Sequence, residues 1–401
     1  MLSGAISETN TRRERKIMIT LRTNQWRNWL NFTAGTVTAL VTVLALATAS
    51  PAMAAKEGLG GKRAFKTYTA NAYIGGDIAR VVAVDPANTM ELLIATTTTF
   101  AEIVASDPPA RMAGIAAQIA AEMPDVLGLE ELYTVMTAPV GGLSPDGSPI
   151  PGTFTVAYDY LSLVTNALAV QGAHYRVAVV ATESDVTLPL IESMDPFQLH
   201  FGRIVDHEAI LVRTDLPPGH LMVSKPMSGT FENRIQFPEV EIDLLRGWCS
   251  VEVFTRGERF RFICTHLEDE TSPVIQKLQA AELLAGPANT KEPVMIVGDF
   301  NADPLRRNGT DTYGDIIAAG FKDAWLTVHP NDPAGGLTWG HDAQLANPAD
   351  LFEWRLDFVF YRKGNLKASE AEVIDASLDR TAPPLWPTDH GTLSVSFDIR
   401  K

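Results

Sequence analysis

Cysteine is scarce in this sequence, with only Cys249 and Cys264 among 401 residues. The chain can therefore form at most one internal disulfide and is not a disulfide-stapled scaffold. Basic residues are also few, since 33 Lys and Arg stand against 48 Asp and Glu and give a formal net charge of −15. Such an acidic protein is poorly suited to holding a nucleic-acid backbone by charge alone, although it can bind phosphate groups locally through a metal ion.

Internal repeats and long runs of one charge are absent, and nothing marks a domain boundary after residue 60. Short apolar runs that are typical of strands alternate with helical patterns along that whole region. Apolar residues make up 46% of the chain, which is enough to bury a large core. We therefore expect one mixed α/β domain over residues 62–401.

The first 54 residues do not belong to that core. Six Lys and Arg come first, an apolar run over residues 32–47 follows, and small residues lead to Ala54. This is the order of a secretory signal, so we predict cleavage after Ala54 and a short linker over residues 55–61. The apolar run is short for a membrane span and is diluted by Thr and Gly. We therefore expect a secreted or periplasmic protein with no transmembrane anchor after processing.

Removal of residues 1–54 takes away six basic and two acidic residues and leaves a formal net charge of −19. The positively charged region is long for a signal, so translation begins at either Met1 or Met18.

The two cysteines lie on two alternating strands joined around Arg256-Gly257. A two-residue turn at that point places Cys249 directly opposite Cys264. In an exported protein this register favours a cross-strand disulfide. Two reduced, buried thiols are an equally good interpretation.

The stretch GDFNADP ends an apolar strand over residues 294–297. Asp299 and Asn301 lie two residues apart and point the same way if the backbone stays extended. One can accept a proton, and the other can donate or accept a hydrogen bond. An Asx turn that closes the strand is the favoured interpretation of these residues when they are taken alone.

Polar side chains occur in or beside several other apolar strands. Carboxylates such as Glu131 and Asp389 suit Mg²⁺ or Mn²⁺, which can neutralise charge that develops on a phosphoryl group. Asp357 lies within an apolar strand and needs a partner, and His390 beside it would be oriented and made more basic. Any one of these residues is explained by a cap or a turn, but the whole set is not. Its members are Asn71, Glu131, His266, Asp299, Asn301, Asp357, Asp389 and His390.

The segment GDFNADP resembles the GDFN motif of the endonuclease/exonuclease/phosphatase superfamily, which includes pancreatic-type deoxyribonuclease, abasic-site endonucleases, inositol-polyphosphate phosphatases and neutral sphingomyelinases. Further segments resemble the other family motifs, in the family's order. They are TYTANAY (67–73), PDVLGLEEL (124–132), CTHLED (264–269), RLDFVFYR (355–362) and TDHGTL (388–393). The segments YDYLSLVTNAL, RIVDHEAILVR and LTW resemble an exported bacterial branch.

This resemblance implies a four-layer α/β/β/α sandwich, in which two mixed β-sheets pack face to face with helices outside. It also implies that Glu131 and Asp389 hold the divalent ion, Mg²⁺ or Mn²⁺, with Asn71 nearby. The resemblance further implies that Asp299 orients or deprotonates the attacking water and that Asn301 binds the scissile phosphate. By the same resemblance His390, paired with Asp357, stabilises the charge at phosphorus or donates a proton there, and His266 is the second catalytic histidine.

The sequence departs from the family pattern at several positions. Glu130 replaces the usual Gln before the metal-binding Glu, and it adds charge to the site or faces the other side of its strand. Tyr133 stands where the deoxyribonuclease has a substrate-contacting Arg. The carboxylate that pairs with the first histidine in some members is Glu183 or Asp185 here. Arg203 and Trp339 are candidate substrate contacts. The alternative for Arg203 is a surface ion pair, and the alternative for Trp339 is packing in the core.

We therefore expect an exported, Mg²⁺-dependent phosphoester hydrolase. Nucleic acid is the first candidate substrate, a phospholipid such as sphingomyelin is the second, and small phosphomonoesters are the third. A non-catalytic scaffold is the weaker alternative, because degenerate members would lose Glu131, Asp299 or His390. The resemblance implies no stable protein partner.

Overall fold

The computed structural model describes residues 65–85, 87–238 and 242–399. The predicted signal peptide, residues 1–54, and the linker, residues 55–61, lie outside the described residues and stay predictions. None of the described helices is long and apolar enough to cross a membrane.

Two large β-sheets form the centre of the domain. The strands of the first sheet are β1 (Phe65–Asn71), β2 (Val126–Glu130), β3 (Thr134–Leu143), β4 (Pro149–Pro151), β5 (Thr155–Asp159), β6 (Tyr175–Met194), β7 (Phe197–Arg213), β16 (Leu366–Val373) and β17 (Leu393–Ile399). The strands of the second sheet are β8 (Leu221–Thr230), β11 (Gly247–Thr255), β12 (Glu258–His266), β13 (Val294–Asp299), β14 (Lys322–Asp323) and β15 (Asp357–Arg362). A separate pair is formed by β9 (Ile235–Phe237) and β10 (Ile242–Leu244).

The strand order of the first sheet is β16-β17-β1-β2-β7-β3-β4, with β5 added beside β3 and β6 beside β7. The order of the second is β14-β15-β13-β12-β11-β8. Each sheet is mixed, because β1 and β2 run parallel in the first and β12 and β13 run parallel in the second. The carboxyl ends of these two pairs carry the polar residues that the sequence singles out.

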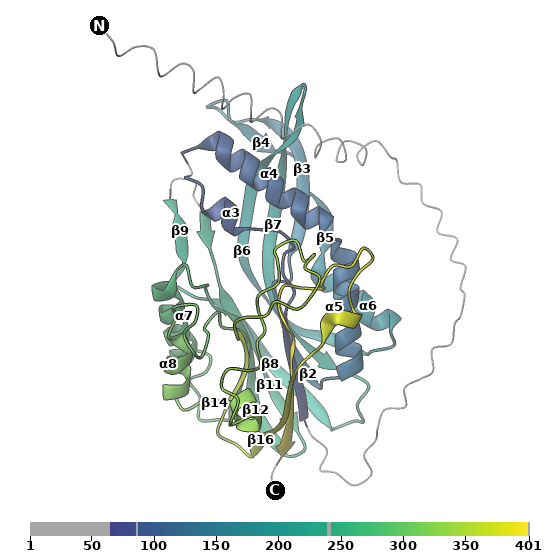
Figure 1. Cartoon of the computed structure of the whole chain (residues 1–401), viewed down its shortest axis with the longest axis vertical. Helices are drawn as coiled ribbons and strands as arrows, with labels where there is room; N and C mark the ends of the chain where they lie inside the picture. The colour runs from purple at the N-terminus through teal and green to yellow at the C-terminus, as the bar shows by residue number, and fades with distance from the viewer. Residues whose placement is uncertain (1–64, 86, 239–241, 400–401) are drawn as a thin grey trace, which may run out of the picture. The chain divides into compact units, whose positions relative to one another are not determined.

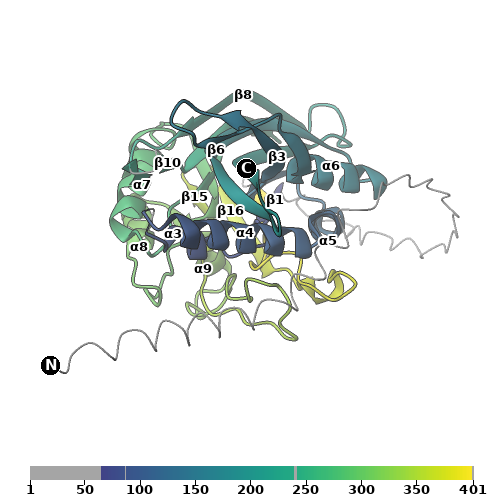
Figure 2. The ribbon, with the colours of Figure 1, turned by 90° about the horizontal axis from the view of Figure 1, so that it is seen from above.

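Helices cover the outer faces of both sheets (Figures 1 and 2). They are α3 (Ala79–Val82), α4 (Thr89–Ala105), α5 (Pro108–Glu122), α6 (Tyr160–Val170), α7 (Pro273–Ala285) and α8 (Thr312–Ala318). The short helix α9 (Ala324–Val328) packs instead against the apolar cluster between the sheets, and a 3₁₀ turn covers Ala376–Leu378. Met112 of α5 and Val164 of α6 pack on the outer face of the first sheet. Leu283 of α7 and Ile316 of α8 do the same on the second sheet.

A third apolar cluster fills the space between the sheets. Val126 and Val212 of the first sheet meet Phe260 and Val297 of the second sheet there. The three clusters define four layers, helices on sheet on sheet on helices. The predicted α/β/β/α sandwich is therefore confirmed.

Asp357 begins β15 instead of lying within it, as the apolar pattern predicts. Two further segments fold against their local pattern. Residues 138–153 are rich in Pro and Gly, which indicate turns, yet they form most of the β3–β4 hairpin. Here β4 is an edge strand, where Pro costs no ladder hydrogen bond. The helix α4 forms although its Thr run has low helix propensity, because Asn88 caps it and its apolar face is buried.

Candidate active site

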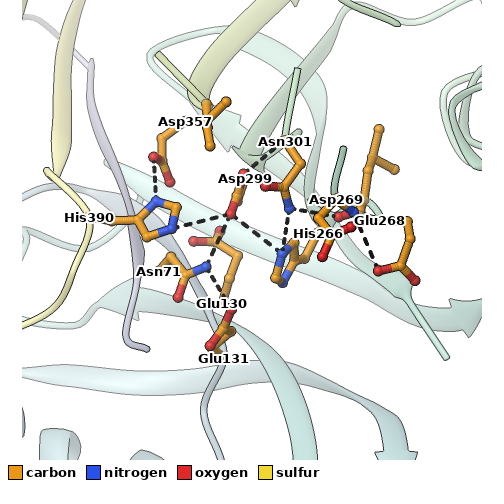
Figure 3. Close-up of polar contacts among 12 residues, drawn as sticks. Asn71, Glu130, Glu131, His266, Glu268, Asp269, Asp299, Asn301, Asp357 and His390 are labelled. Carbon is orange, nitrogen blue, oxygen red and sulfur yellow. Dashed lines mark hydrogen bonds and ion pairs between the residues drawn. The ribbon is translucent and has the colours of Figure 1, made fainter. Parts of the chain in front are cut away.

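Asp299, the last residue of β13, lies at the centre of a cluster of polar side chains (Figure 3). Its Oδ2 accepts a hydrogen bond from Asn71 Nδ2 at 3.1 Å. The same oxygen lies 3.4 Å from His266 Nε2 and 3.6 Å from His390 Nε2. Burial raises the pKa of Asp299 well above its usual range. The arrangement therefore holds one buried carboxyl group, suited to accepting a proton, within reach of both histidines.

Asn301 follows through a turn that the local sequence dictates. Its φ of 49° takes the chain out of the strand, and its backbone N–H donates to Asp299 Oδ1 at 2.8 Å. Gly298 has a φ of 138°, and a Cβ there would lie 1.9 Å from the Thr265 carbonyl oxygen, so only glycine fits. The favoured Asx turn is thus present, and it also carries the side chain of Asn301 to within 3.1 Å of His266 Nε2.

His390 is held by Asp357 from the facing sheet. Its Nδ1 lies 2.8 Å from Asp357 Oδ2, and both side chains are buried. The backbone N–H of Asp357 donates to Thr338 Oγ1 at 3.1 Å, which holds the backbone at the start of β15. Burial opposes a charged ring, but the carboxylates of Asp357, Asp299 and Asp389 outweigh it and raise the pKa of His390 well above its usual range. The raised pKa favours the imidazolium form of the ring, in which an Nε2–H faces Asp299.

His266 has a cationic partner, which differs from the prediction. Arg246 NH1 lies 2.9 Å from His266 Nδ1. A guanidinium can only donate, so Nδ1 accepts and the ring proton is on Nε2. Burial, followed by Arg246 and His390, lowers the pKa of His266 well below its usual range, and the ring is neutral. Asn301 Nδ2 donates to the Leu267 carbonyl at 3.0 Å, so its approach to Nε2 is a packing contact in this tautomer.

Neither of the expected partners of His266 contacts it. Asp185 is exposed and pairs with Arg203 at the surface, because the two lie on neighbouring positions of β6 and β7. Glu183 is buried near Gly247, whose Cβ, if present, would lie 3.0 Å from Glu183 Oε1. The register of the cysteine hairpin could have identified Arg246 as the partner of His266. That register places Gly247 opposite His266, so the preceding residue, Arg246, lies beside the ring.

Three side chains with oxygen atoms lie together at or just beyond the carboxyl ends of β1 and β2 and just before β17. They belong to Asn71, Glu131 and Asp389. Asn71 Nδ2 donates to Glu131 Oε1 at 3.1 Å, and the Ile74 N–H donates to Glu131 Oε2 at 3.2 Å. Asp389 is buried, and its Oδ1 has no hydrogen-bond partner among the described residues. Burial, reinforced by Glu131 and opposed by His390, raises the pKa of Asp389 to about 6. A divalent cation beside the two carboxylates would offset the cost of burying Asp389 and its repulsion from Glu131. These residues therefore fit a metal site.

Asp299, Asp357 and His390 also place three potential ligand atoms within 4.8 Å of one another. His390 is already paired with Asp357 through Nδ1 and is cationic, which disfavours it as a metal ligand. The Glu131 and Asp389 oxygens are therefore the better set for a hard ion.

Arg111 of α5 links the two loops that carry the candidate metal-binding residues, and no local sequence pattern predicts this. It is fully buried, and its NH1 donates to the carbonyls of Ala72 at 3.0 Å and Pro387 at 2.9 Å. Its NH2 donates to the Tyr73 carbonyl at 3.0 Å. Ala72 follows Asn71, and Pro387 precedes Asp389 by two residues, so one guanidinium fixes both segments.

The two expected substrate contacts have different surroundings. Trp339 is half-buried, stacks on Trp354 with ring centroids 4.6 Å apart, and pairs through its backbone with His390. It therefore lies beside the cluster. Arg203 forms an exposed ion pair with Asp185 and lies over the ring of Phe154, so the surface alternative describes it better.

Glu130 faces away from the site, into the space between the sheets. Its Oε1 accepts from Thr69 Oγ1 at 2.8 Å and from Cys264 Sγ at 3.0 Å. Burial raises its pKa to about 8. Cys249 and Cys264 are opposite one another, as the predicted register requires, but both are free. In this structure the Cys264 thiol donates to Glu130 Oε1, and the choice between a disulfide and two thiols stays a prediction.

Comparison with known proteins decides the family. Residues 104–390 match the Endonuclease/Exonuclease/phosphatase family. The chain belongs to this family. It is therefore a phosphoester hydrolase, and its two sheets form the sandwich of that family. No curated protein sequence matches the chain.

Solved structures share the fold at low sequence identity. An endonuclease/exonuclease/phosphatase protein from Beutenbergia cavernae is 18% identical with a TM-score of 0.50, and the alignment covers 84% of this chain and 72% of that one. The mannosyl-6-phosphatase Bt3783 from Bacteroides thetaiotaomicron is 13% identical with a TM-score of 0.50, covering 83% of this chain and 99% of that one. At these identities the likeness describes the fold alone.

Proposed function

We propose that this protein is an exported, Mg²⁺-dependent phosphodiesterase whose substrate is nucleic acid. The observation that carries the hydrolytic part is the position of Asp299, a buried carboxylate with two histidines and two asparagines around it. Export rests on the signal pattern that ends at Ala54. Mg²⁺ rests on the hard oxygen donors of Glu131 and Asp389.

Asp299 is the proton acceptor. Its raised pKa means that the carboxylate takes a proton more readily than an exposed aspartate does. A water held by Asp299 attacks phosphorus, its proton passes to the carboxylate, and the bond from phosphorus to the leaving oxygen breaks. Asn301 and the Nε2–H of neutral His266 lie on one side of Asp299 and donate to the phosphoryl oxygens.

His390 lies on the other side of Asp299. Its imidazolium, held by Asp357, donates its Nε2 proton to the leaving oxygen, so the protons balance over the step. Glu131 and Asp389 would hold Mg²⁺ beside Asn71, and the bound ion neutralises negative charge on the phosphate.

Nucleic acid is supported by the stacked pair Trp339 and Trp354. Both rings are half-buried, and the backbone of Trp339 adjoins His390. An aromatic face at the rim of a phosphodiesterase site is suited to stacking on a base, independently of sequence. The net negative charge of the chain works against binding a long backbone, and a divalent ion held by Glu131 and Asp389 would supply the local attraction for phosphate.

A phospholipid is the second candidate, and one feature favours it. Beyond the active-site end, β3 continues nine residues past Thr134, about 30 Å of strand. Apolar side chains are exposed at the tips of the β3–β4 and β6–β7 hairpins. They are Val140, Leu143, Ile150, Met194 and Phe197, with exposed fractions of 39–68%. Such tips are suited to contact with a lipid surface.

A substrate panel tests the proposal. The panel holds plasmid DNA, RNA, sphingomyelin vesicles, bis-p-nitrophenyl phosphate and p-nitrophenyl phosphate, each with Mg²⁺, Mn²⁺ or EDTA. We expect Mg²⁺-dependent cleavage of DNA by the wild type and none by His390→Ala. Trp339→Ala should lower DNA turnover, whereas Leu143→Ser should leave it unchanged. Selective cleavage of sphingomyelin, reduced by Leu143→Ser, would replace nucleic acid with lipid, and activity in EDTA would refute the metal role.

A further inference from the structure

A second group of buried polar side chains lies between the two sheets, apart from the cluster around Asp299. Glu208 comes from β7 of the first sheet, and Cys249 and Cys264 come from β11 and β12 of the second. One ligand atom from each lies within 4.8 Å of the other two, and all three residues are at most 1% exposed. The two cysteines belong to the apolar cluster between the sheets, where unpaired polar groups are costly.

The carboxylates in this region have few hydrogen-bond donors. Both side-chain oxygens of Glu208 and Oε2 of Glu130 accept no hydrogen bond of good geometry from the described residues, and the Glu208 carboxyl group lies against that of Glu183. The nearby cation, Arg246, is committed elsewhere, with ion pairs to Asp206 at 3.5 Å and to Glu268 at 3.7 Å. Several carboxyl and thiol groups, each of which is anionic when it loses its proton, are thus buried together. Their ligand atoms are available, and no positive charge in the described part of this region matches them.

We propose that Glu208, Cys249 and Cys264 bind a zinc ion, and that Glu130, which already contacts Cys264, turns toward the ion as the fourth ligand. Zinc prefers four ligands and accepts both thiolate sulfur and carboxylate oxygen, whereas Mg²⁺ does not take sulfur. Glu130 Oε1 already lies 3.0 Å from Cys264 Sγ, which places an oxygen donor beside the thiols. The thiols lose their protons on binding, and the ion supplies the missing positive charge.

The site would be structural. The two sulfurs belong to directly paired residues of one sheet, and Glu208 and Glu130 belong to the facing sheet. An ion among them cross-links the two sheets. Glu130 directly precedes Glu131, so the cross-link also fixes the strand that delivers the catalytic carboxylate. This zinc is distinct from the catalytic ion, and the inference stands whether or not the proposed substrate is correct.

Two other states compete for the same atoms. Protons alone could neutralise the group, because burial, followed by Glu183 and Cys249, raises the pKa of Glu208 well above its usual range. Oxidation would join Cys249 to Cys264 and remove both sulfur ligands. The experiment must therefore separate a metal from protons and from a disulfide.

Elemental analysis of the full chain makes this separation. The protein is produced in zinc-supplemented medium and purified without a chelator, as the wild type and as Glu208→Gln, Cys249→Ser and Glu131→Gln. We expect one zinc per chain in the wild type and in Glu131→Gln, which changes only the catalytic site. Glu208→Gln and Cys249→Ser should retain at least tenfold less zinc.

Cobalt provides a readout that does not depend on whether the variants fold. Wild-type protein refolded with Co²⁺ should show the absorption of a thiolate-to-cobalt charge transfer, and its thiols should resist alkylation. A folded wild type that holds no zinc and gives no thiolate–cobalt band would overturn the proposal. So would a mass measurement that shows Cys249 disulfide-bonded to Cys264.

Discussion

Arg246 donates a hydrogen bond to Nδ1 of His266 at 2.9 Å, so a guanidinium sets the tautomer of a candidate catalytic imidazole. The ring proton is thereby fixed on Nε2, 3.4 Å from Asp299 Oδ2. In this chain the histidine is a neutral donor, whereas a carboxylate partner would make it more basic.

Replacing Arg246 with Met should lower kcat by about 10–100-fold, because His266 loses the group that orients it. It should also raise the pKa of His266, since Arg246 is one of the groups that lower it. If catalysis needs the neutral ring, the acidic limb of the kcat/KM profile then moves to higher pH. Arg246→Lys should restore part of kcat, and Arg203→Ala is the control, with an unchanged profile. An unmoved acidic limb in Arg246→Met would contradict the role given to this pair.

Asp357→Asn keeps the shape of the side chain and removes its charge. The carboxylate of Asp357 is the largest of the effects that raise the pKa of His390. Without it the imidazolium loses its proton at lower pH, so the basic limb of the profile should shift downward. The rate at the optimum should fall about 10²–10³-fold. A pH–rate series on bis-p-nitrophenyl phosphate measures both, and an unshifted basic limb would mean that His390 is not the acid.

Arg111→Met should destabilise the fold and loosen the metal site. The substitution leaves the carbonyls of Ala72, Tyr73 and Pro387 buried without their donor. We expect a loss of about 2–4 kcal/mol in the free energy of unfolding and a higher Mg²⁺ concentration for half-maximal activity. Urea unfolding and a Mg²⁺ titration measure these changes. Arg203→Ala, which breaks an exposed ion pair, should be neutral in both.

His341 makes stability depend on pH. Its ring is stacked between Phe352 and Trp386, with centroids 4.3 Å from each, and burial lowers its pKa to about 4. The unfolded chain, with a pKa of about 6.5, then binds the proton more strongly, so stability present above pH 6.5 is lost as pH falls toward 4. His341→Phe keeps the stack and should remove about 1–2 kcal/mol of this acid-induced loss. Thermal unfolding at pH 7 and pH 5 tests it, and an equal acid-induced drop in both proteins would exclude His341 as the cause.

Local patterns predicted a mixed α/β domain and the positions of several polar residues, and the resemblance to the family implied the four-layer sandwich. Apolar strands that end in polar residues are local patterns, so Asp299, His266 and Asn71 could be placed at strand ends without knowledge of the tertiary fold. The hairpin register was predictable for the same reason, because turn length fixes which residues face each other, as Cys249 and Cys264 do.

Long-range contacts were harder to predict. Nothing in the sequence around Arg111 predicts that its side chain reaches the loops of the candidate active site. Its hydrogen-bond partners lie up to 276 residues away along the chain. Arg246 was overlooked because a carboxylate was expected beside His266. The extended β3–β4 hairpin was missed because Pro and Gly indicate turns, yet edge strands accept both. In each case tertiary packing outweighed the local pattern.

The central claim is that Asp299 activates water for attack on a phosphoester. The most direct measurement compares Mg²⁺-dependent hydrolysis of bis-p-nitrophenyl phosphate by the wild type and by Asp299→Asn, with circular dichroism to show that both fold. Because Asn cannot accept the proton, we predict that the variant loses about 10³-fold or more in kcat and keeps its fold. A folded Asp299→Asn protein with turnover near that of the wild type would contradict the account.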